Sequence, residues 1–231
     1  MSISTRSIAY SAFRSPAGDL FVAHDGERAL AVRPADQHRF TAWLEDHLGA
    51  PARMAEMPWP VLRALDDAVG GRDVHRPSLA GLDAFDREVL LKTFEIPRGE
   101  VRSYAWIASQ IGRGGETREV GASLAANPLP LLVPCHRVVR SDFELGWYNC
   151  GGRRAKRAML AHEGVDVDLL DELARGRARY LGSHTAGAFC HPTCLAAREI
   201  PATHRVLFRS PEGAKAAGYR ACEVCRPLEQ H

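Results

Sequence analysis

The chain has 231 residues, of which 45% are hydrophobic and 25% charged, and its formal net charge is +2. This composition is that of an ordinary globular protein, and no apolar run approaches the roughly 18 residues that a membrane helix needs. We therefore expect no membrane association. The N-terminus lacks the charged-then-apolar order of a secretory signal, so we expect a cytoplasmic protein with reduced cysteines. The length fits two or three compact units.

The charge is unevenly distributed along the chain. Residues 1–174 carry a net charge of −3, whereas residues 175–231 carry +5. A basic end suits an anionic partner such as nucleic acid, but a solvated basic surface gives the same pattern. Charge alone favours neither interpretation.

The first part of the chain predicts a small α/β domain over residues 1–81. Residues 7–33 contain extended segments on both sides of an Asp25-Gly26 turn, which is typical of a β-hairpin. Helical periodicity follows from Asp36 to Leu48 and again from Pro60 to Val69.

Residues 82–165 predict a helical domain. Asp83 suits the N-cap of one helix and Ser103 that of a second. A third helix is predicted from Glu116 to Ala126, so residues 103–126 have a helix-turn-helix layout. That layout places the second helix against DNA in some proteins and is plain helical packing in others.

A basic helix is predicted from Arg154 to Glu163, and the composition of the chain changes after it. A polar stretch over residues 166–177 predicts a linker helix. Residues 178–231 form a short unit, rich in glycine and proline, that contains four of the six cysteines. A unit of this size rarely has enough core to fold unaided.

The cysteines of this last unit form two close pairs, Cys190 with Cys194 and Cys222 with Cys225. Four thiolates at this spacing fit a tetrahedral zinc site, and metal binding would supply the folding energy that the small core lacks. Two disulfides or unpaired core thiols are the alternatives. Because disulfides are uncommon in the cytosol, we expect one zinc ion.

A different cysteine motif lies in the turn Pro134–Val139, where Cys135 directly precedes His136. An adjacent imidazole or positive charge lowers the pKa of a thiol, so the pair is typical of an activated nucleophile. Cysteine is also among the residues that are most often buried, and a lone Cys-His pair is usually structural. The pair by itself leaves both interpretations open.

Further motifs surround this turn. They are Ile96–Gly99, Ser103-Tyr104, Arg118 with Val120-Gly121, Asn127-Pro128 and His162–Gly164. Together with the turn they closely resemble the O6-alkylguanine-DNA alkyltransferase family, over roughly residues 1–165 and most specifically from Phe85 on. The resemblance implies an α+β fold, with a small RNase H-like N-terminal domain before a helical alkyltransferase domain that contains the helix-turn-helix.

The resemblance also implies a DNA repair protein. It would flip an alkylated guanine out of double-stranded DNA and transfer the alkyl group from O6 to Cys135, and it would treat O4 of thymine in the same way. Flipping is required because a nucleophile cannot reach O6 in line while the base is stacked. Water does not cleave the thioether product, so the protein would act once. We expect a monomer without an organic cofactor.

By the same resemblance, other residues take defined roles. His136, held by Glu163, would act through a water as the base for the thiol. Tyr104 would help to rotate the DNA backbone and would protonate the leaving guanine, Arg118 would fill the space that the base leaves, and Asn127 would brace the turn. Ser103 and Arg137 are further candidates for DNA contacts, and Val138, Tyr148 and Asn149 are candidates for contacts with the guanine or its alkyl group.

Three positions depart from the family pattern. Glu119 replaces a small apolar residue, and its carboxylate repels phosphates, so we expect weaker DNA affinity or a shifted helix. Phe143 replaces a glycine after the active site, which changes the backbone angles open to that loop. The segment Trp147–Gly152 is one residue longer than in the shortest relatives. Within it, Cys150 is either a second thiol at the pocket mouth or, as we favour, a buried bystander.

The C-terminal unit carries motifs of its own, among them Tyr180–Ser183, Phe189–Cys194, Ala217–Arg220 and Cys225–Pro227. They resemble the metal-binding domain of Ada proteins. That resemblance implies a four-cysteine zinc site whose first cysteine, matching Cys190, takes the methyl group from methyl phosphotriesters in DNA. The domain order is reversed relative to Ada, which argues against a role in transcriptional control.

Three functions follow from these resemblances. The first is a DNA repair protein with two centres, in which Cys135 repairs bases and Cys190 repairs the backbone. The second is a methylation-responsive sensor or regulator, in which the zinc domain is a DNA-binding tether. The third is a binding protein for alkylated bases, and the intact Cys135 argues against it.

Overall fold

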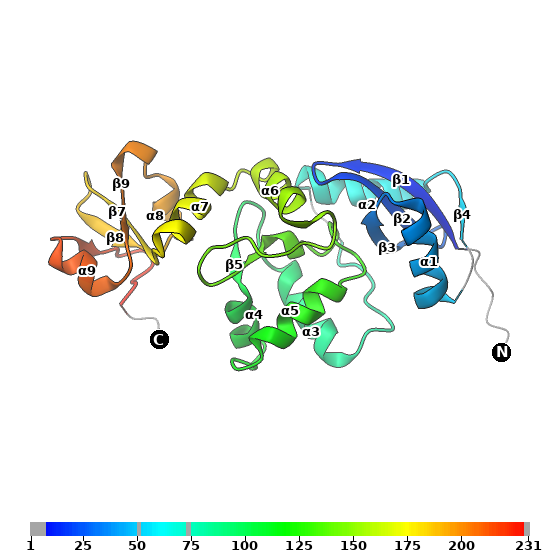
Figure 1. Ribbon diagram of the computed structural model, residues 1–231, viewed down its shortest axis with the longest axis horizontal. Helices are drawn as coiled ribbons and strands as arrows, with labels where there is room; N and C mark the ends of the chain where they lie inside the picture. Colours follow the sequence, from blue (N-terminus) through cyan, green and yellow to red (C-terminus); the bar gives the residue numbers. More distant parts are fainter. Residues whose placement is uncertain (1–7, 50–51, 73–74, 229–231) are drawn as a thin grey trace.

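The computed structural model describes residues 8–49, 52–72 and 75–228, and it has a mixed α+β fold, as expected (Figure 1). The molecule is elongated, with a sheet near the N-terminus at one end, a helical middle part, and a second sheet at the other end. Within the described ranges, no helix is both long enough and apolar enough to cross a membrane.

The N-terminal part is a four-stranded sheet with the order β3-β2-β1-β4. The predicted hairpin forms around residue 25, and the two predicted helices follow it. Phe21 and Ala23 pack beneath α1, whereas Leu20 and Val22 face the rest of the chain, because successive side chains of a strand point to opposite faces. The elements are β1 (Ala9–Ser15), β2 (Gly18–His24), β3 (Ala29–Pro34), α1 (Gln37–Leu48), β4 (Arg53–Met54) and α2 (Trp59–Gly70).

The middle part holds the helices that were predicted around the Cys135 turn. Asp83 and Ser103 cap α3 and α4, because their side chains accept hydrogen bonds from the backbone N–H of Asp86 and Trp106. One apolar core joins these helices to the second face of the N-terminal sheet. The elements are α3 (Ala84–Phe94), β5 (Arg102–Ser103), α4 (Tyr104–Gln110), α5 (Thr117–Ala126), the 3-10 turn η1 (Cys135–Arg137), β6 (Val138–Val139) and α6 (Gly152–His162).

The C-terminal part is a small four-stranded sheet with the order β10-β8-β7-β9, and short helices lie around it. Its strands carry the cysteines at or near their ends, since Cys190 ends β8 and Cys222 follows β10. The elements are α7 (Val167–Gly176), β7 (Tyr180–Ser183), β8 (Ala188–Cys190), α8 (Leu195–Arg198), the 3-10 turn η2 (Ala202–His204), β9 (Arg205–Phe208), α9 (Pro211–Ala216) and β10 (Arg220–Ala221).

The segment that we predicted as a linker helix forms α7, which packs against both the middle part and the C-terminal part of the molecule. Its buried residues are Val167, Leu169, Leu170 and Leu173. They belong to one apolar cluster that also contains Leu145 and Leu160 of the middle part and Ala197 of the C-terminal part. The two parts therefore share a core.

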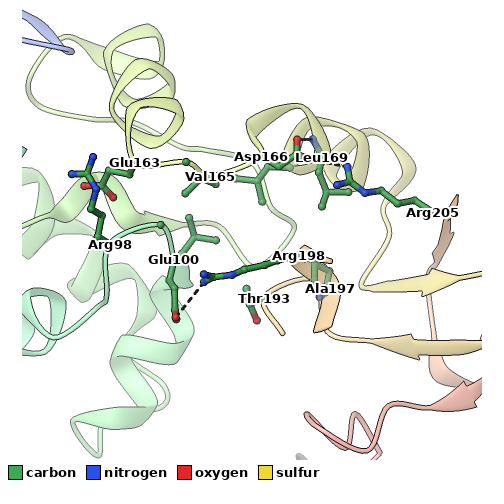
Figure 2. Close-up of a pocket in the computed structure, with 15 residues that line it drawn as sticks. Arg98, Glu100, Glu163, Val165, Asp166, Leu169, Thr193, Ala197, Arg198 and Arg205 are labelled. Atoms are coloured by element: carbon green, nitrogen blue, oxygen red, sulfur yellow. Dashed lines mark hydrogen bonds and ion pairs between the residues drawn. The ribbon is translucent and has the colours of Figure 1, made fainter. Parts of the chain in front are cut away.

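A cleft of about 300 Å³ lies between α7, α8 and the loop that contains Glu100 (Figure 2). Two ion pairs line it: Arg198 reaches Glu100 at 3.2 Å, and Arg205 reaches Asp166 at 2.7 Å. The first pair links the C-terminal part directly to the middle part.

Phe143 stands where the related proteins usually have a glycine, and the structure shows how this loop accommodates the larger residue. The residue has a φ of 66°, the left-handed conformation that glycine adopts most easily, at a cost of roughly 1–2 kcal/mol for a residue with a Cβ. Its ring packs against the shared apolar cluster. The Arg179 guanidinium also donates to the Ser141 carbonyl. The C-terminal part thus holds the loop that follows the Cys135 turn.

Candidate functional site around two cysteine centres

Cys135 is buried at the start of the turn η1, with 6% of its surface exposed. Asn127, which is fully buried, donates from Nδ2 to the Cys135 sulfur at 3.2 Å and to the Val133 carbonyl at 3.3 Å. Its Oδ1 accepts from the Leu129 backbone N–H at 2.9 Å. Asn127 therefore fixes both the turn and the direction of the sulfur.

The backbone carbonyl of Asn127 is a second anchor point. It accepts hydrogen bonds from Arg33 Nη1 at 2.9 Å and from Asn149 Nδ2 at 3.0 Å. Arg33 comes from β3 and Asn149 from the loop before α6. The N-terminal sheet and the pocket loop are therefore both tied to the residue that holds Cys135.

Burial raises the pKa of the Cys135 thiol, against the hydrogen bond from Asn127 and the charges of Lys156 and Arg33. This differs from the expectation that neighbouring groups lower the pKa. The physical reason is that a thiolate inside the protein loses its hydration, which partners at this distance do not fully replace. At rest Cys135 is a neutral thiol, so its deprotonation has to accompany the reaction.

His136, Glu163 and Arg137 form a buried network beside the thiol. His136 Nε2 and Arg137 Nη2 both bond Glu163 Oε1 at 2.8 Å, and Arg137 Nε donates to Oε2 at 2.9 Å. Burial opposes ionisation of Glu163, but these hydrogen bonds outweigh it and lower its pKa to about 2. The carboxylate is therefore charged.

The charged carboxylate selects the His136 tautomer that has its proton on Nε2. Burial lowers the pKa of His136 more strongly than Glu163 raises it, so the ring is neutral. Its Nδ1 is buried and has no hydrogen-bond partner among the residues that the structure describes. That nitrogen is available to accept a proton.

A small cavity of about 50 Å³ opens beside the sulfur. Tyr148 is 2% exposed and packs edge-on against the His136 ring, with centroids 5.9 Å apart. Burial raises the pKa of Tyr104, which keeps its hydroxyl protonated.

Cys150 does not line this cavity. It is 1% exposed, and burial raises the pKa of its thiol. Both observations agree with the interpretation that we favoured, a buried cysteine without a role at the pocket mouth. The cavity is lined by other residues. The lining residues are Tyr104, Gly121, Leu124, Ala125, Cys135, Trp147, Tyr148 and Asn149.

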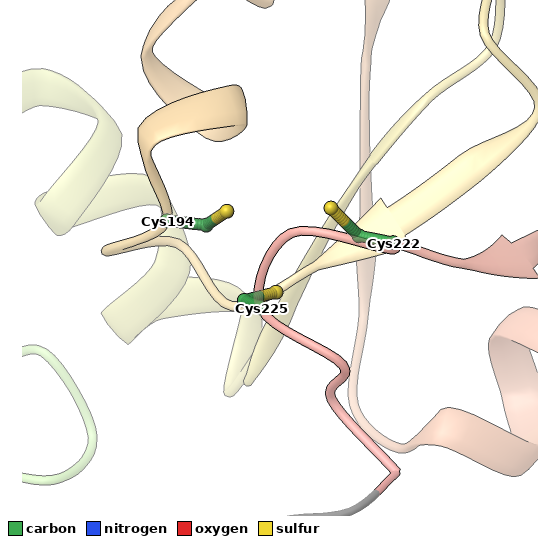
Figure 3. Close-up of side chains that lie close together, drawn as sticks. All are labelled: Cys194, Cys222 and Cys225. Carbon is green, nitrogen blue, oxygen red and sulfur yellow. The ribbon is translucent and has the colours of Figure 1, made fainter.

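The second centre lies in the C-terminal part, where the sulfurs of Cys194, Cys222 and Cys225 all lie within 4.8 Å of one another (Figure 3). All six cysteines are free thiols, which removes the alternative of two disulfides. Zinc–sulfur bonds of about 2.3 Å in a tetrahedron hold sulfurs roughly 3.8 Å apart, so three converging thiols fit a zinc ion.

Cys190 lies beside this group rather than within it. It is 3% exposed, and its sulfur points to the Leu181 carbonyl at 3.5 Å. Burial raises the pKa of Cys190, and the three neighbouring sulfurs raise it further. The structure therefore brings three of the four predicted ligands together and places the fourth next to them.

Two segments of the chain match known protein families. Residues 84–165 match the family described as "6-O-methylguanine DNA methyltransferase, DNA binding domain", and residues 171–228 match "Metal binding domain of Ada". The structure of Mycobacterium tuberculosis OGT in complex with DNA is similar at 30% identity and a TM-score of 0.53, covering 71% of this chain and 99% of that one. The chain belongs to the O6-methylguanine-DNA methyltransferase family. It also carries a C-terminal Ada-type metal-binding domain.

Other members of the family are also similar to this chain in structure or in sequence. The O6-methylguanine-DNA methyltransferase of Pyrococcus kodakaraensis has a TM-score of 0.55 at 25% identity, covering 68% of this chain and 99% of that one. The methylated-DNA–protein-cysteine methyltransferases of mouse and human are 40% and 38% identical to it over 126 and 137 residues. These matches cover 54% and 59% of this chain and the same shares of those proteins, so the chain spans little more than half the length of the curated relatives.

Arg137 has a different place from the one that we predicted for this methyltransferase family member. We expected it to contact DNA, but its side chain is only 12% exposed and bonds Glu163 and, at 2.6 Å, the Ile96 carbonyl. A guanidinium with these buried acceptors is not free for phosphates. In the structure Arg137 positions Glu163 instead.

The remaining candidates for DNA contact lie on or next to α4 and α5, the two helices for which a helix-turn-helix layout was predicted. Arg118 and Glu119 are exposed in the first turn of α5, and neither forms an ion pair within the described part of the chain. Ser103 uses its hydroxyl to cap α4, accepting from the Trp106 N–H at 3.0 Å. A carboxylate at the N-terminus of α5 is favourable for the helix itself.

Sequence reasoning missed Lys156. It is fully buried, and its Nζ donates at 2.5 Å to the backbone carbonyl of Val138, one of the residues predicted to contact the guanine or its alkyl group. Burial lowers its pKa to about 8, although Cys135 acts in the opposite direction. The signal was present in the sequence, because Lys156, Leu160 and the C-cap residue Glu163 are spaced so that they share one face of α6.

Proposed function

We propose that the chain repairs alkylated DNA by moving an alkyl group from O6 of guanine to Cys135. The observation that carries this proposal is a buried thiol, held by Asn127 beside a neutral imidazole and an ionised carboxylate, at the wall of a cavity. The comparisons support it, since relatives that match this segment are named methyltransferases of methylated DNA. We extend the proposal to O4 of thymine, because its alkyl–oxygen bond has the same chemistry.

In the proposed reaction the Cys135 sulfur attacks the alkyl carbon, and the bond between this carbon and O6 breaks with its electrons going to the guanine. The thiol proton leaves toward His136 Nδ1. The departing guanine gains a proton from the Tyr104 hydroxyl at the cavity, and the proton held on His136 then restores Tyr104. The net change exchanges one alkyl group for one proton, and no further reactant is needed.

For DNA recognition we propose that α4 and α5 work as a helix-turn-helix, with Arg118 pointing to the duplex. Double-stranded DNA with an extrahelical alkylguanine would be the partner, bound by a monomer in the reducing cytoplasm. The strand order β3-β2-β1-β4, in which β4 is parallel to β1, supports an RNase H-like N-terminal domain. For the domain limits we keep residues 1–81, 82–165 and 178–231, with 166–177 between them.

The test of base repair is a peptide map. The protein is incubated with duplexes that carry a single O6-methylguanine or O4-methylthymine, and methylated cysteines are then found by mass spectrometry. We expect the methyl group on Cys135 and its complete loss in Cys135→Ser. Cys150→Ser is the matched control, because it removes a buried thiol that does not line the cavity. Methyl transfer that persists in Cys135→Ser contradicts the proposal.

For the second centre we propose that Cys190, Cys194, Cys222 and Cys225 hold one zinc ion and that Cys190 accepts methyl groups from phosphotriesters. Zinc, when bound, keeps the thiols deprotonated and reactive near neutral pH. The position of Cys190, buried beside the three converging sulfurs, supports this assignment.

A duplex with a single methyl phosphotriester distinguishes this proposal from the sensor alternative. We expect a methyl group on Cys190 and none in Cys190→Ala. If the unmodified chain takes no methyl from the phosphotriester but still binds the duplex through this domain, the domain is a tether. If methylation of Cys190 raises DNA affinity severalfold, the sensor function is supported as well.

A further inference from the structure

Glu119 is an unpaired acidic residue on the helix that borders the Cys135 cavity. It is exposed in the first turn of α5 and forms no ion pair within the described part of the chain. By contrast, Glu116, at the N-cap of the same helix, is paired with Arg113 at 3.3 Å. The Glu119 carboxylate therefore keeps its oxygens for water or for a partner outside the chain.

The position of the cavity brings DNA over this helix. Gly121, Leu124 and Ala125 of α5 line the cavity beside Cys135. A flipped base stays bonded to its DNA backbone, so it can reach the sulfur only while its own duplex covers the mouth of the cavity. The exposed side of α5 then faces the DNA, and Glu119 belongs to that side.

The side chains on this surface of α5 are short. Within this helix, which the structure describes completely, the exposed residues are Arg118, Glu119, Ala122, Ala125 and Ala126. Glu119, Ala122 and Ala126 are spaced by three and four residues, so they share one side of the helix. On that side Glu119 is the only one of the three that extends beyond a methyl group. Its carboxylate loses water when a duplex docks against the alanines.

A carboxylate in this place distinguishes between base pairs. It only accepts hydrogen bonds, and the donors that the grooves of DNA offer are the amino groups of bases. A G·C pair carries an amino group in each groove, whereas an A·T pair carries one in the major groove alone. A dehydrated carboxylate that meets no donor is costly, and nearby phosphates repel it. The adjacent Arg118 does not compensate, because successive residues on a helix do not face each other.

We propose that Glu119 is a specificity-determining residue that accepts a hydrogen bond from an amino group of a G·C pair next to the alkylated guanine. The chain would then repair lesions between G·C pairs in preference to lesions between A·T pairs. The inference rests on the proposed alkyl transfer to Cys135 and adds to that centre a preference for the neighbouring sequence. The transfer step itself is unchanged.

The experiment compares two duplexes that carry one O6-methylguanine and differ only in the pairs on either side of it, G·C in one and A·T in the other. The rate at which Cys135 becomes methylated is measured by mass spectrometry, with protein in excess but below saturation. The chains are the unmodified protein, Glu119→Ala, Glu119→Gln and Glu45→Ala. Glu45 is the matched control, because it is an exposed glutamate of α1 that does not line the cavity.

The quantity to compare is the ratio of the G·C rate to the A·T rate in each protein, relative to the unmodified chain, since this cancels differences in stacking between the duplexes. In Glu119→Ala we expect this ratio to fall about fivefold, the effect of losing one base contact. Glu119→Gln, which keeps an acceptor oxygen, should retain part of the preference, and Glu45→Ala should leave the ratio as it is. A third duplex with inosine in place of the flanking guanines identifies the donor: guanine N2 if the preference disappears, cytosine N4 if it persists.

An unchanged ratio in Glu119→Ala overturns this inference alone, even if both rates change. A structural role of Glu119 in α5, or its repulsion of phosphates, alters both rates by the same factor and leaves the ratio constant. An unmodified chain that methylates Cys135 from neither duplex overturns the proposed function and this inference with it.

Discussion

Burial is the largest influence on the pKa values of Cys135, His136 and Glu163, and at Glu163 hydrogen bonding reverses its effect. It raises the pKa of Cys135 and lowers that of His136, so both are neutral. At Glu163 the hydrogen bonds from His136 and Arg137 lower the pKa by more than burial raises it, so the carboxylate is ionised. In the resting site the Glu163 carboxylate is therefore ionised, whereas the thiol and the imidazole are neutral.

The first prediction concerns Glu163→Gln. The pKa of Glu163 is about 2 in the folded protein against an ordinary value of 4.5, which corresponds to about 3 kcal/mol of stability above pH 5. Because the folded pKa is depressed, this contribution is nearly complete above pH 5 and declines as the pH falls from 5 toward 2. Urea unfolding should show the variant destabilised at pH 7, with the difference shrinking by about 2 kcal/mol at pH 3. A difference that does not depend on pH contradicts this account.

The second prediction concerns Lys156→Met. The Lys156 charge favours the Cys135 thiolate and, with a pKa of about 8, is present at pH 7 and lost above pH 9. We expect the variant to transfer methyl groups about tenfold more slowly at pH 7. The two rates should converge as pH rises through 8. Lys215→Met, which removes an exposed lysine, is the control, and a rate ratio that is constant from pH 7 to 9 argues against a charge effect.

At the scale of elements, the sequence predicted those helices well whose ends carry local signals. Asp83 and Ser103 cap the helices that they were expected to cap, and Asp36 caps the helix that was predicted to begin there. The packing of α7 between the middle and C-terminal parts could not be predicted from local signals, because its apolar residues show only that one face of the helix is buried. The partners of that face come from segments before and after it in the chain.

At the site, too, the sequence predicted local features but not those that depend on contacts between distant segments. The Cys135 turn and its partners could be predicted from motifs, whereas the direction of the Arg137 side chain depended on where the fold placed the Glu163 carboxylate and the Ile96 carbonyl. The pKa of Cys135 likewise depended on burial, which adjacency in sequence does not report.

The third prediction tests α7. Leu173 is fully buried in the shared cluster, so Leu173→Ala should lower the free energy of unfolding by about 2–5 kcal/mol in urea titrations. Leu195→Ala is the matched control, because Leu195 is 64% exposed in α8 and its loss should cost less than about 0.5 kcal/mol. Equal effects of the two substitutions would mean that α7 is not packed as described.

At the scale of the whole molecule, the shared core joins the two cysteine centres. The cluster that contains Leu145 and Leu160 also contains Cys190, Cys194 and Cys222. Phe143, the unusual residue in the loop after Cys135, packs against this same cluster. The substitution that strains the loop therefore also connects it to the metal-binding domain.

The fourth prediction follows from this joint core. Removal of the proposed zinc ion by a chelator, or by Cys222→Ser, should destabilise the C-terminal domain, because metal binding would contribute to its folding. Since the core is shared, calorimetry should show the melting of the alkyltransferase part at a lower temperature as well. The metal content of each sample is measured in parallel. A transition of the alkyltransferase part that does not move when zinc is lost contradicts the shared core.

The central claim is that Cys135 takes one alkyl group and keeps it. A titration of the protein with excess duplex carrying O6-methylguanine tests it most directly, with intact-mass spectrometry to count methyl groups and peptide mapping to place them. We expect the reaction to stop when each chain carries one methyl group, located on Cys135. Continued demethylation of DNA beyond one equivalent of protein, or a methyl group on any other cysteine with Cys135 unmodified, would contradict it.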